Sequence, residues 1–217
     1  MTYRQFEVMQ NAVTGFNEHQ YAHAATYLED GAIGVGEDHT HRAGRDFATR
    51  LIEAGLVRNL FLEGKSSAQS SLDRAAKAAR DSRSSARLKR VVNDAGPRYF
   101  SLPMTLGDVA AIARRKNVNI HLIDQDVAEE VGYKSKYERV AARDFHAAER
   151  FARITAETGT VGSMVLYGAV HLMRGKPWYP DENVMCLGEL LSLTSFIAVP
   201  EVLPVLPRKR TPAIAGA

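Results

Sequence analysis

Acids and histidines follow short apolar runs at four places in this sequence. Carboxylates and imidazoles are the side chains that most often move protons in enzymes, and they also bind divalent metals. The four groups are Glu37 with His39 after Ala32–Val35, Glu63 at the end of 56–63, Asp124 at the end of 118–124, and His171 shortly after 163–167. These residue types predict either proton-transfer chemistry, such as hydrolysis, or a metal site.

The apolar runs have the length and composition of buried strands, and helical patterns separate them. A helix is predicted to open at Gly44 after a glycine turn at Gly36, and another from the N-cap Thr105 to about Lys116. The clearest helical pattern spans 138–158 and stops at Gly159. In a strand–helix–strand unit the two strands are parallel, and ligands bind beyond their carboxyl ends. We therefore expect the acids and histidines to meet at one edge of a sheet.

This alternation predicts an α/β fold, with an open, mostly parallel sheet flanked by helices. At 217 residues the chain fits a single domain, which we place at 1–207, followed by a disordered Pro/Ala-rich tail at 208–217. A further helix is expected at 5–28 and a last strand at 195–199.

The stretch 66–92 is a Ser/Ala/Arg-rich insertion that we expect to be helical. Between Lys65 and Arg90 there are eight Lys or Arg residues and two Asp residues. Such a segment can contact an acidic partner, a phosphoinositide surface or RNA, or it can be a solvated helical pair. We favour the solvated pair, because no aromatic residues are interleaved to stack on bases.

The composition excludes several classes of protein. The net charge of +3 is too mild to indicate a nucleic-acid partner. The single cysteine, Cys186, excludes a disulfide or a thiolate metal cluster within the chain, and we expect a buried thiol rather than a nucleophile. The N-terminal stretch lacks the apolar core of a Sec signal peptide, and no apolar run approaches the roughly 18 residues that a membrane span needs. We expect a soluble protein.

Four short motifs resemble one protein family. They are GEDH after the first strand, FLEG at the end of the second, the pair Arg143-Asp144 near the start of the long helix, and Gly168-Ala169-Val170-His171 after a late strand. In order and spacing, over about 31–172, they resemble the erythromycin-esterase/ChaN-like fold. Tiki/TraB metalloproteases and a domain of certain bacterial toxins and type III effectors share that fold.

The resemblance implies roles for five residues. Glu37 and His39 would form the first active pair, Glu63 the second acid, Arg143 the helix-borne cation and His171 the second imidazole. In the esterases such groups activate water. In Tiki-type proteins they hold a divalent metal, which here would bind Glu37, His39, Glu63 and His171. ChaN proteins bind haem instead. In the esterases two residues separate the Glu from the His. Here one residue separates Glu37 from His39, as in ChaN-like proteins. This spacing argues against an ester substrate.

Three hypotheses follow. In the first, the chain is a hydrolase in which His39, held by Glu37 or Glu63, takes a proton from water while His171 and Arg143 stabilise the oxyanion. In the second, the same chemistry belongs to an effector or toxin that is secreted into a host cell rather than kept in the bacterial cytoplasm. Its substrate is not identified by the sequence, and a host protein is one candidate partner. In the third, a non-catalytic module binds haem or a metabolite, with Tyr167 and His171 as axial ligands.

The remaining polar and aromatic residues are expected either to support the fold or to contact the substrate. Asp144, Asp126 and His121 are interpreted as helix caps or satisfied core polar groups. The residues expected to contact substrate are Asp124, His41, Tyr167 and Trp178.

Overall fold

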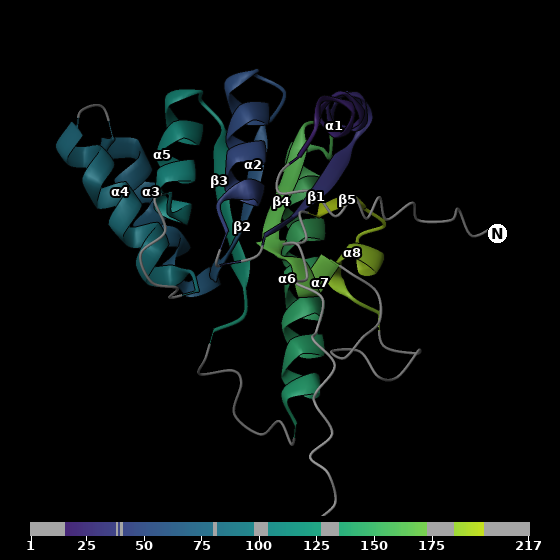
Figure 1. Cartoon of the computed structure of the whole chain (residues 1–217). Coiled ribbons are helices and arrows are strands. Elements are labelled where there is room, and N and C mark those ends of the chain that lie inside the picture. The colour runs from purple at the N-terminus through teal and green to yellow at the C-terminus, as the bar shows by residue number, and fades with distance from the viewer. Residues whose placement is uncertain are drawn as a thin grey trace, which may run out of the picture.

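Five parallel strands form one open sheet in the computed structural model (Figure 1), in the order β3-β2-β4-β1-β5. The strands are β1 (Ala32–Glu37), β2 (Asn59–Lys65), β3 (Asn119–Asp124), β4 (Ser163–Gly168) and β5 (Thr194–Ile197). The described residues are 16–37, 39, 41–79, 82–97, 104–126, 135–172 and 185–197. The predicted α/β class, with an open parallel sheet and flanking helices, is confirmed.

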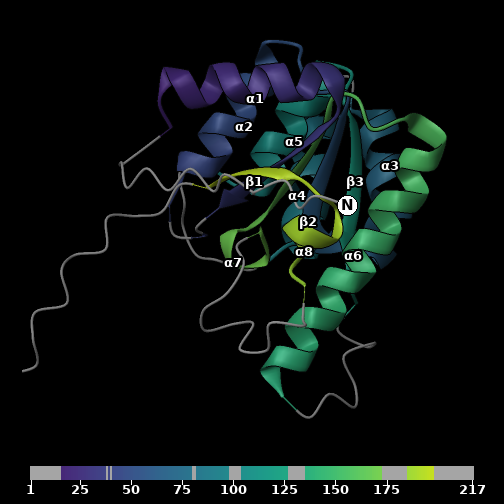
Figure 2. The ribbon, with the colours of Figure 1, turned by 90° about the vertical axis from the view of Figure 1, so that its right-hand side faces the viewer.

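Helices cover both faces of this sheet (Figure 2). One apolar core lies between the sheet and α1–α5, and a second lies between the sheet and α6, α7 and α8. The helices are α1 (Glu18–Asp30), α2 (Ala43–Glu53), α3 (Gln69–Ala78), α4 (Ser82–Ala95), α5 (Leu106–Arg115), α6 (Lys136–Thr158), α7 (Ala169–Leu172) and α8 (Leu187–Leu190), with a 3-10 turn at Ser66–Ala68. The N-terminal turns of α6 extend past the sheet edge where α7 lies (Figures 1 and 2).

The Ser/Arg-rich insertion is helical, as predicted, and forms α3 and α4. It is more than a solvated pair, because each helix contributes buried residues to the first apolar core. These are Leu72 and Ala75 from α3, and Leu88 and Val92 from α4. The basic residues therefore stand on helices that are anchored to the body of the domain.

The first strand is longer than the sequence predicted. We expected a glycine turn at Gly36, but β1 continues through Gly36 to Glu37. A Cβ on Gly36 would lie 2.8 Å from Ile197 Cγ1 and 3.2 Å from Ala169 Cα. The glycine thus allows β5 and α7 to pack directly against the strand, and it does not turn the chain.

The ends of two helices are set by the residues that the sequence indicated. The Thr105 hydroxyl accepts a hydrogen bond from the Asp108 backbone N–H at 3.2 Å, and the Asp108 carboxylate accepts one from the Thr105 N–H at 2.8 Å. This capping box begins α5. Helix α6 ends at Gly159, whose φ of +81° lies in the left-handed region that favours glycine.

Among the described residues, no helix is both long enough and apolar enough to cross a membrane. The predictions for residues 5–15, 198–199 and 208–217 lie outside the described residues, so the domain limits of 1–207 stay an expectation.

Candidate active site

The strand order brings four strand ends side by side. Along the sheet, β3, β2, β4 and β1 are neighbours, so their carboxyl ends form one continuous edge. Asp124, Glu63, Gly168 and Glu37 lie at these four ends. The register pairs Glu37 of β1 with Gly168 of β4. Polar groups far apart in the sequence therefore lie in one row, as expected for parallel strands.

Glu37 is held between an imidazole and a guanidinium. Its Oε1 lies 2.7 Å from His39 Nδ1, and Arg45 donates to both carboxylate oxygens, from Nε at 2.6 Å and from Nη2 at 3.0 Å. Glu37 and Arg45 are buried. Burial by itself would raise the pKa of Glu37, but the hydrogen bonds and charges of His39 and Arg45 outweigh it and lower that pKa. Glu37 is therefore an ionised, fixed acceptor for the His39 ring.

Helix α2 supplies Arg45 because its first turn rests on the end of β1. A Cβ on Gly44 would lie only 3.0 Å from Glu37 Cβ, so the helix approaches the strand closely at this glycine. Arg45 also donates from Nη1 to the Met104 carbonyl at 2.8 Å. The Arg45 guanidinium is thus bonded both to Glu37 and to the Met104 carbonyl, and it holds the Glu37 carboxylate in one orientation.

Glu63 is the second carboxylate of the row, and three groups surround it. Arg143 donates from Nη2 to Oε1 at 2.8 Å, and the Gly168 backbone N–H donates to Oε2 at 2.7 Å. His39 Nε2 lies 3.6 Å from the same Oε2. The His39 ring therefore stands between Glu37 and Glu63, which come from different strands.

Asp124 and Tyr167 complete the surroundings of Arg143. Arg143 donates from Nε and Nη2 to the two oxygens of Asp124 at 2.9 and 2.6 Å. The Tyr167 hydroxyl donates to Asp124 Oδ1 at 2.8 Å. Burial raises the pKa of Tyr167 well above its ordinary value, and the nearby carboxylates raise it further, so this hydroxyl stays a donor. Asp124 and Tyr167 were expected to contact substrate, but the contacts place both around Arg143.

His171 is fixed by Asp144, which follows Arg143 in α6. His171 Nδ1 lies 2.5 Å from Asp144 Oδ1, and the Leu187 backbone N–H donates to Asp144 Oδ2 at 3.0 Å. Both side chains are buried. Burial acts to lower the pKa of His171, but the hydrogen bond and charge of Asp144 outweigh it and raise that pKa above its ordinary value.

Gly168 packs closely against the two histidines and Glu63. A Cβ built on this glycine would lie 3.0 Å from His39 Nε2, 3.0 Å from Glu63 Oε2 and 3.4 Å from His171 Cδ2. Three of the five residues predicted to be catalytic therefore meet around Gly168, where only a glycine fits without displacing them. The other two, Glu37 and Arg143, hold His39 and Glu63 from the far side.

The described residues do not fit the metal site that a Tiki-like reading implies. Both oxygens of Glu37 accept from Arg45, and one oxygen of Glu63 accepts from Arg143 and the other from a backbone N–H. A divalent ion would compete with two guanidinium groups for these carboxylates. No group of three or more His, Cys, Asp or Glu in the described parts of the chain is arranged to hold a metal.

Haem ligation by Tyr167 and His171 would also require existing contacts to break, because the Tyr167 hydroxyl is bonded to Asp124. Cys186 is buried as expected, and burial raises the pKa of its thiol to about 12. A thiol that stays protonated at neutral pH is a poor nucleophile.

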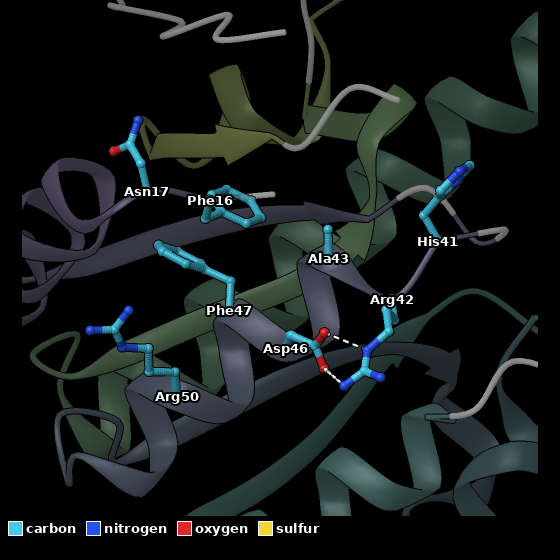
Figure 3. Close-up of a pocket in the computed structure, with 8 residues that line it drawn as sticks. All are labelled: Phe16, Asn17, His41, Arg42, Ala43, Asp46, Phe47 and Arg50. Carbon is cyan, nitrogen blue, oxygen red and sulfur yellow. Dashed lines mark hydrogen bonds and ion pairs between the residues drawn. The ribbon is translucent and has the colours of Figure 1, made fainter. Parts of the chain in front are cut away.

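The remaining predicted substrate contacts lie elsewhere or outside the described residues. His41 is exposed and borders an open pocket of about 440 Å³ next to α2, opposite the stacked rings of Phe16 and Phe47 (Figure 3). Arg42 and Asp46 in the same pocket pair with each other. Trp178 lies outside the described residues.

Sequence reasoning missed the parts played by Arg45 and Gly168 and took Asp144 for a cap or a core polar group. Arg45 stands in the first turn of the helix that follows Glu37, the position from which a side chain can reach back to the strand end. Gly168 was interpreted only as a turn, although its missing side chain lets His39 and Glu63 approach the end of β4 closely.

A scan against protein-family models finds no match for this chain, and a search of curated protein sequences finds none either. Solved structures do match. The type III effector HopBA1 superposes with a TM-score of 0.50 and 14% identity, over 82% of this chain and 78% of that one. RRSP, a MARTX toxin effector domain from Vibrio vulnificus CMCP6, superposes with a TM-score of 0.56 and 16% identity, over 83% of this chain and 37% of that one. The chain shares its fold with bacterial effector and toxin domains.

At these identities the likeness concerns the fold alone, and this chain spans little more than a third of the RRSP structure. The effector and toxin part of the sequence-based resemblance is thus supported. The narrower resemblance to erythromycin esterases and ChaN stays a prediction.

Proposed function

We propose that this chain is a hydrolase of the erythromycin-esterase/ChaN-like superfamily and that it serves as a bacterial effector or toxin, delivered into a host cell. The observation that carries the hydrolase proposal is the position of His39 between two carboxylates from different strands, beside Gly168. The fold shared with HopBA1 and RRSP supports the effector part.

The hydrogen bond to Glu37 sets the role of His39. An ionised carboxylate only accepts hydrogen bonds, so His39 Nδ1 carries a proton and Nε2 is the ring atom that faces Glu63. The 3.6 Å between His39 Nε2 and Glu63 Oε2 is too long for a direct hydrogen bond, but a water molecule that donates to both atoms fits the pair. That water is the proposed nucleophile.

In the proposed reaction the water oxygen attacks a carbonyl carbon of the substrate, and its proton passes to His39 Nε2. Glu63 orients the water and stabilises the imidazolium that forms on His39. General-base assistance of this kind accelerates hydrolysis by roughly 10²–10⁴-fold. His171, whose Cδ2 edge lies close to Gly168, is the second imidazole of the proposed site.

Arg143 takes a different part from the one the sequence suggested. We expected it to stabilise the oxyanion, but its guanidinium donates to Glu63 and Asp124. In the proposal it is a positioning residue that keeps Glu63 ionised and oriented, and Asp124 and Tyr167 in turn hold Arg143.

The proposal is tested by incubating the purified protein with a eukaryotic cell lysate in H₂¹⁸O. Hydrolysis of an ester or amide leaves one ¹⁸O atom in the new carboxylate, which mass spectrometry detects without knowledge of the substrate. We expect labelled products with the wild type, formed at least about 100-fold more slowly by His39→Ala and Glu63→Gln.

Matched controls are His19→Ala and Glu157→Gln, two exposed residues on α1 and α6, which should label like the wild type. The proposal is wrong if the wild type yields no labelled products, or if His39→Ala forms them at the wild-type rate.

A further inference from the structure

We propose that Asp144 is a positioning residue that makes His171 the proton donor to the leaving group, so that the two histidines of the site have opposite duties. This inference rests on the proposed hydrolase function. It extends that function by naming the catalytic acid and the residue through which the protein controls it.

Asp144 is placed to fix the His171 ring in one orientation. Both of its oxygens are engaged, Oδ1 by His171 Nδ1 at 2.5 Å and Oδ2 by the Leu187 backbone N–H at 3.0 Å. Because these partners come from α7 and from the start of α8, the carboxylate links three separate elements. It is fully buried and cannot exchange these contacts for water without local opening.

The same contact leaves the other edge of the ring on the side of Gly168. Nδ1 faces Asp144, so Nε2 lies on the opposite edge of the imidazole, next to Cδ2. Cδ2 is the His171 atom nearest to the position that a Cβ on Gly168 would take, at 3.4 Å. Because Nε2 is bonded to Cδ2, it belongs to the edge of the ring nearer to Gly168, where His39 and Glu63 meet.

The charge of Asp144 favours the protonated form of His171. Burial acts to lower the pKa of His171, but the hydrogen bond and charge of Asp144 outweigh it and raise that pKa. Among the described residues, the other titratable or charged groups that face His171 are Glu63 from β2, Tyr167 from β4, Arg143 from α6 and His39 from the loop after β1.

The proton balance of the reaction is complete with these two residues. Water gives one proton to His39 Nε2 as its oxygen bonds to the carbonyl carbon. When the bond from that carbon to the leaving group breaks, His171 Nε2 gives its proton to the leaving oxygen or nitrogen. His39 then loses its proton and His171 regains one through solvent, which returns the site to its starting state.

Two measurements on the wild type test this inference. NMR of protein labelled at the histidine rings, with the His171 signal assigned by its loss in His171→Asn, gives the titration midpoint of His171. The rate of ¹⁸O labelling against pH gives the alkaline limb of activity. We expect this limb to coincide with the His171 midpoint, because only the imidazolium can donate.

The Asp144→Asn variant then separates positioning from mere support of the fold. An amide keeps the shape of Asp144 but removes its charge, so the His171 midpoint and the alkaline limb should both move to lower pH, and the neutral-pH rate should fall by about 100-fold. Adding Asp144→Asn to His171→Asn should cause little further loss, because Asp144 acts through His171.

The outcomes distinguish this inference from the proposed function. If the wild-type alkaline limb does not follow the His171 midpoint, or if Asp144→Asn leaves that midpoint unchanged, the inference is wrong while hydrolysis through His39 stands. If the wild type labels nothing, the proposed function fails, and the role of His171 as an acid fails with it.

Discussion

Replacing Gly168 with alanine should disable the site while leaving the fold in place. The added methyl group would lie 3.0 Å from both His39 Nε2 and Glu63 Oε2, closer than the roughly 3.5 Å at which a carbon atom meets its neighbours without strain. The two side chains would have to withdraw by a few tenths of an ångström, away from the positions proposed to hold the attacking water. The glycines with positive φ in the described residues are Gly55, Gly159 and Gly162, so alanine meets no backbone strain at 168.

The size of each effect follows from the geometry. Overpacking by one methyl group costs about 1–3 kcal/mol of unfolding free energy. In a protein of this size each kcal/mol lowers the melting temperature by roughly 2–4 °C, so the variant should stay folded at 25 °C. Misplacing catalytic groups by about 1 Å costs about 100-fold in rate, so a shift of a few tenths of an ångström costs on the order of 10-fold. We therefore expect a modest fall in thermal stability and a fall on the order of 10-fold in ¹⁸O labelling.

Gly31→Ala is the matched control. The nearest atom to a Cβ there is the Tyr27 carbonyl oxygen at 3.9 Å, an ordinary contact, and its φ of −173° is extended backbone. This variant should label at the wild-type rate. If Gly168→Ala is folded and also labels at the wild-type rate, the site around Gly168 is not where the reaction takes place.

Two further predictions concern the charges that hold the site. Arg143→Ala leaves the buried carboxylates of Glu63 and Asp124 without their shared cation, so it should lower the free energy of unfolding in urea by about 3 kcal/mol. The control is Arg139→Ala, at an exposed residue one turn away on α6, which should cost less than about 0.5 kcal/mol. Equal losses in the two variants would show that the Arg143 pairs contribute nothing. The pKa of Glu37 is lower in the folded state than the unfolded value of 4.5. Its contribution to stability is therefore fully present above pH 4.5 and is lost as the pH falls through the folded pKa. The difference in unfolding free energy between the wild type and Glu37→Gln should accordingly shrink at acid pH. A difference that stays constant from neutral to strongly acid pH contradicts this assignment.

The meeting of the acids and histidines was predictable because it depends on strand topology. Buried runs such as 118–124 and 163–167 indicated parallel strands, and parallel strands joined by helices place their carboxyl ends at one edge. The convergence of Glu37, Glu63 and Asp124 needed no knowledge of side-chain conformation. The strand order itself, with β4 between β1 and β2, was not predictable, because no local pattern specifies which strands become neighbours.

The partners of these groups depend on how each helix is rotated and how deeply it packs, and the sequence does not state either. Arg143 and Asp144 are consecutive in α6, yet one turns to Glu63 and the other to His171. Asp144 was interpreted as a satisfied polar group of the core. Asp144 is indeed buried, but the sequence did not show that its partner is His171. The spacing of residues along the chain does not reveal which side chains from different elements meet.

The central claim is that His39 and Glu63 act together on one water molecule, and a double variant tests it most directly. His39→Ala, Glu63→Gln and the combination of both are compared with the wild type by the rate of ¹⁸O labelling. When two groups work as a unit, replacing either one removes the rate acceleration that both provide. We therefore predict that the double variant is no slower than the slower single variant. If the two losses multiply, His39 and Glu63 contribute independently, and the shared water molecule is ruled out.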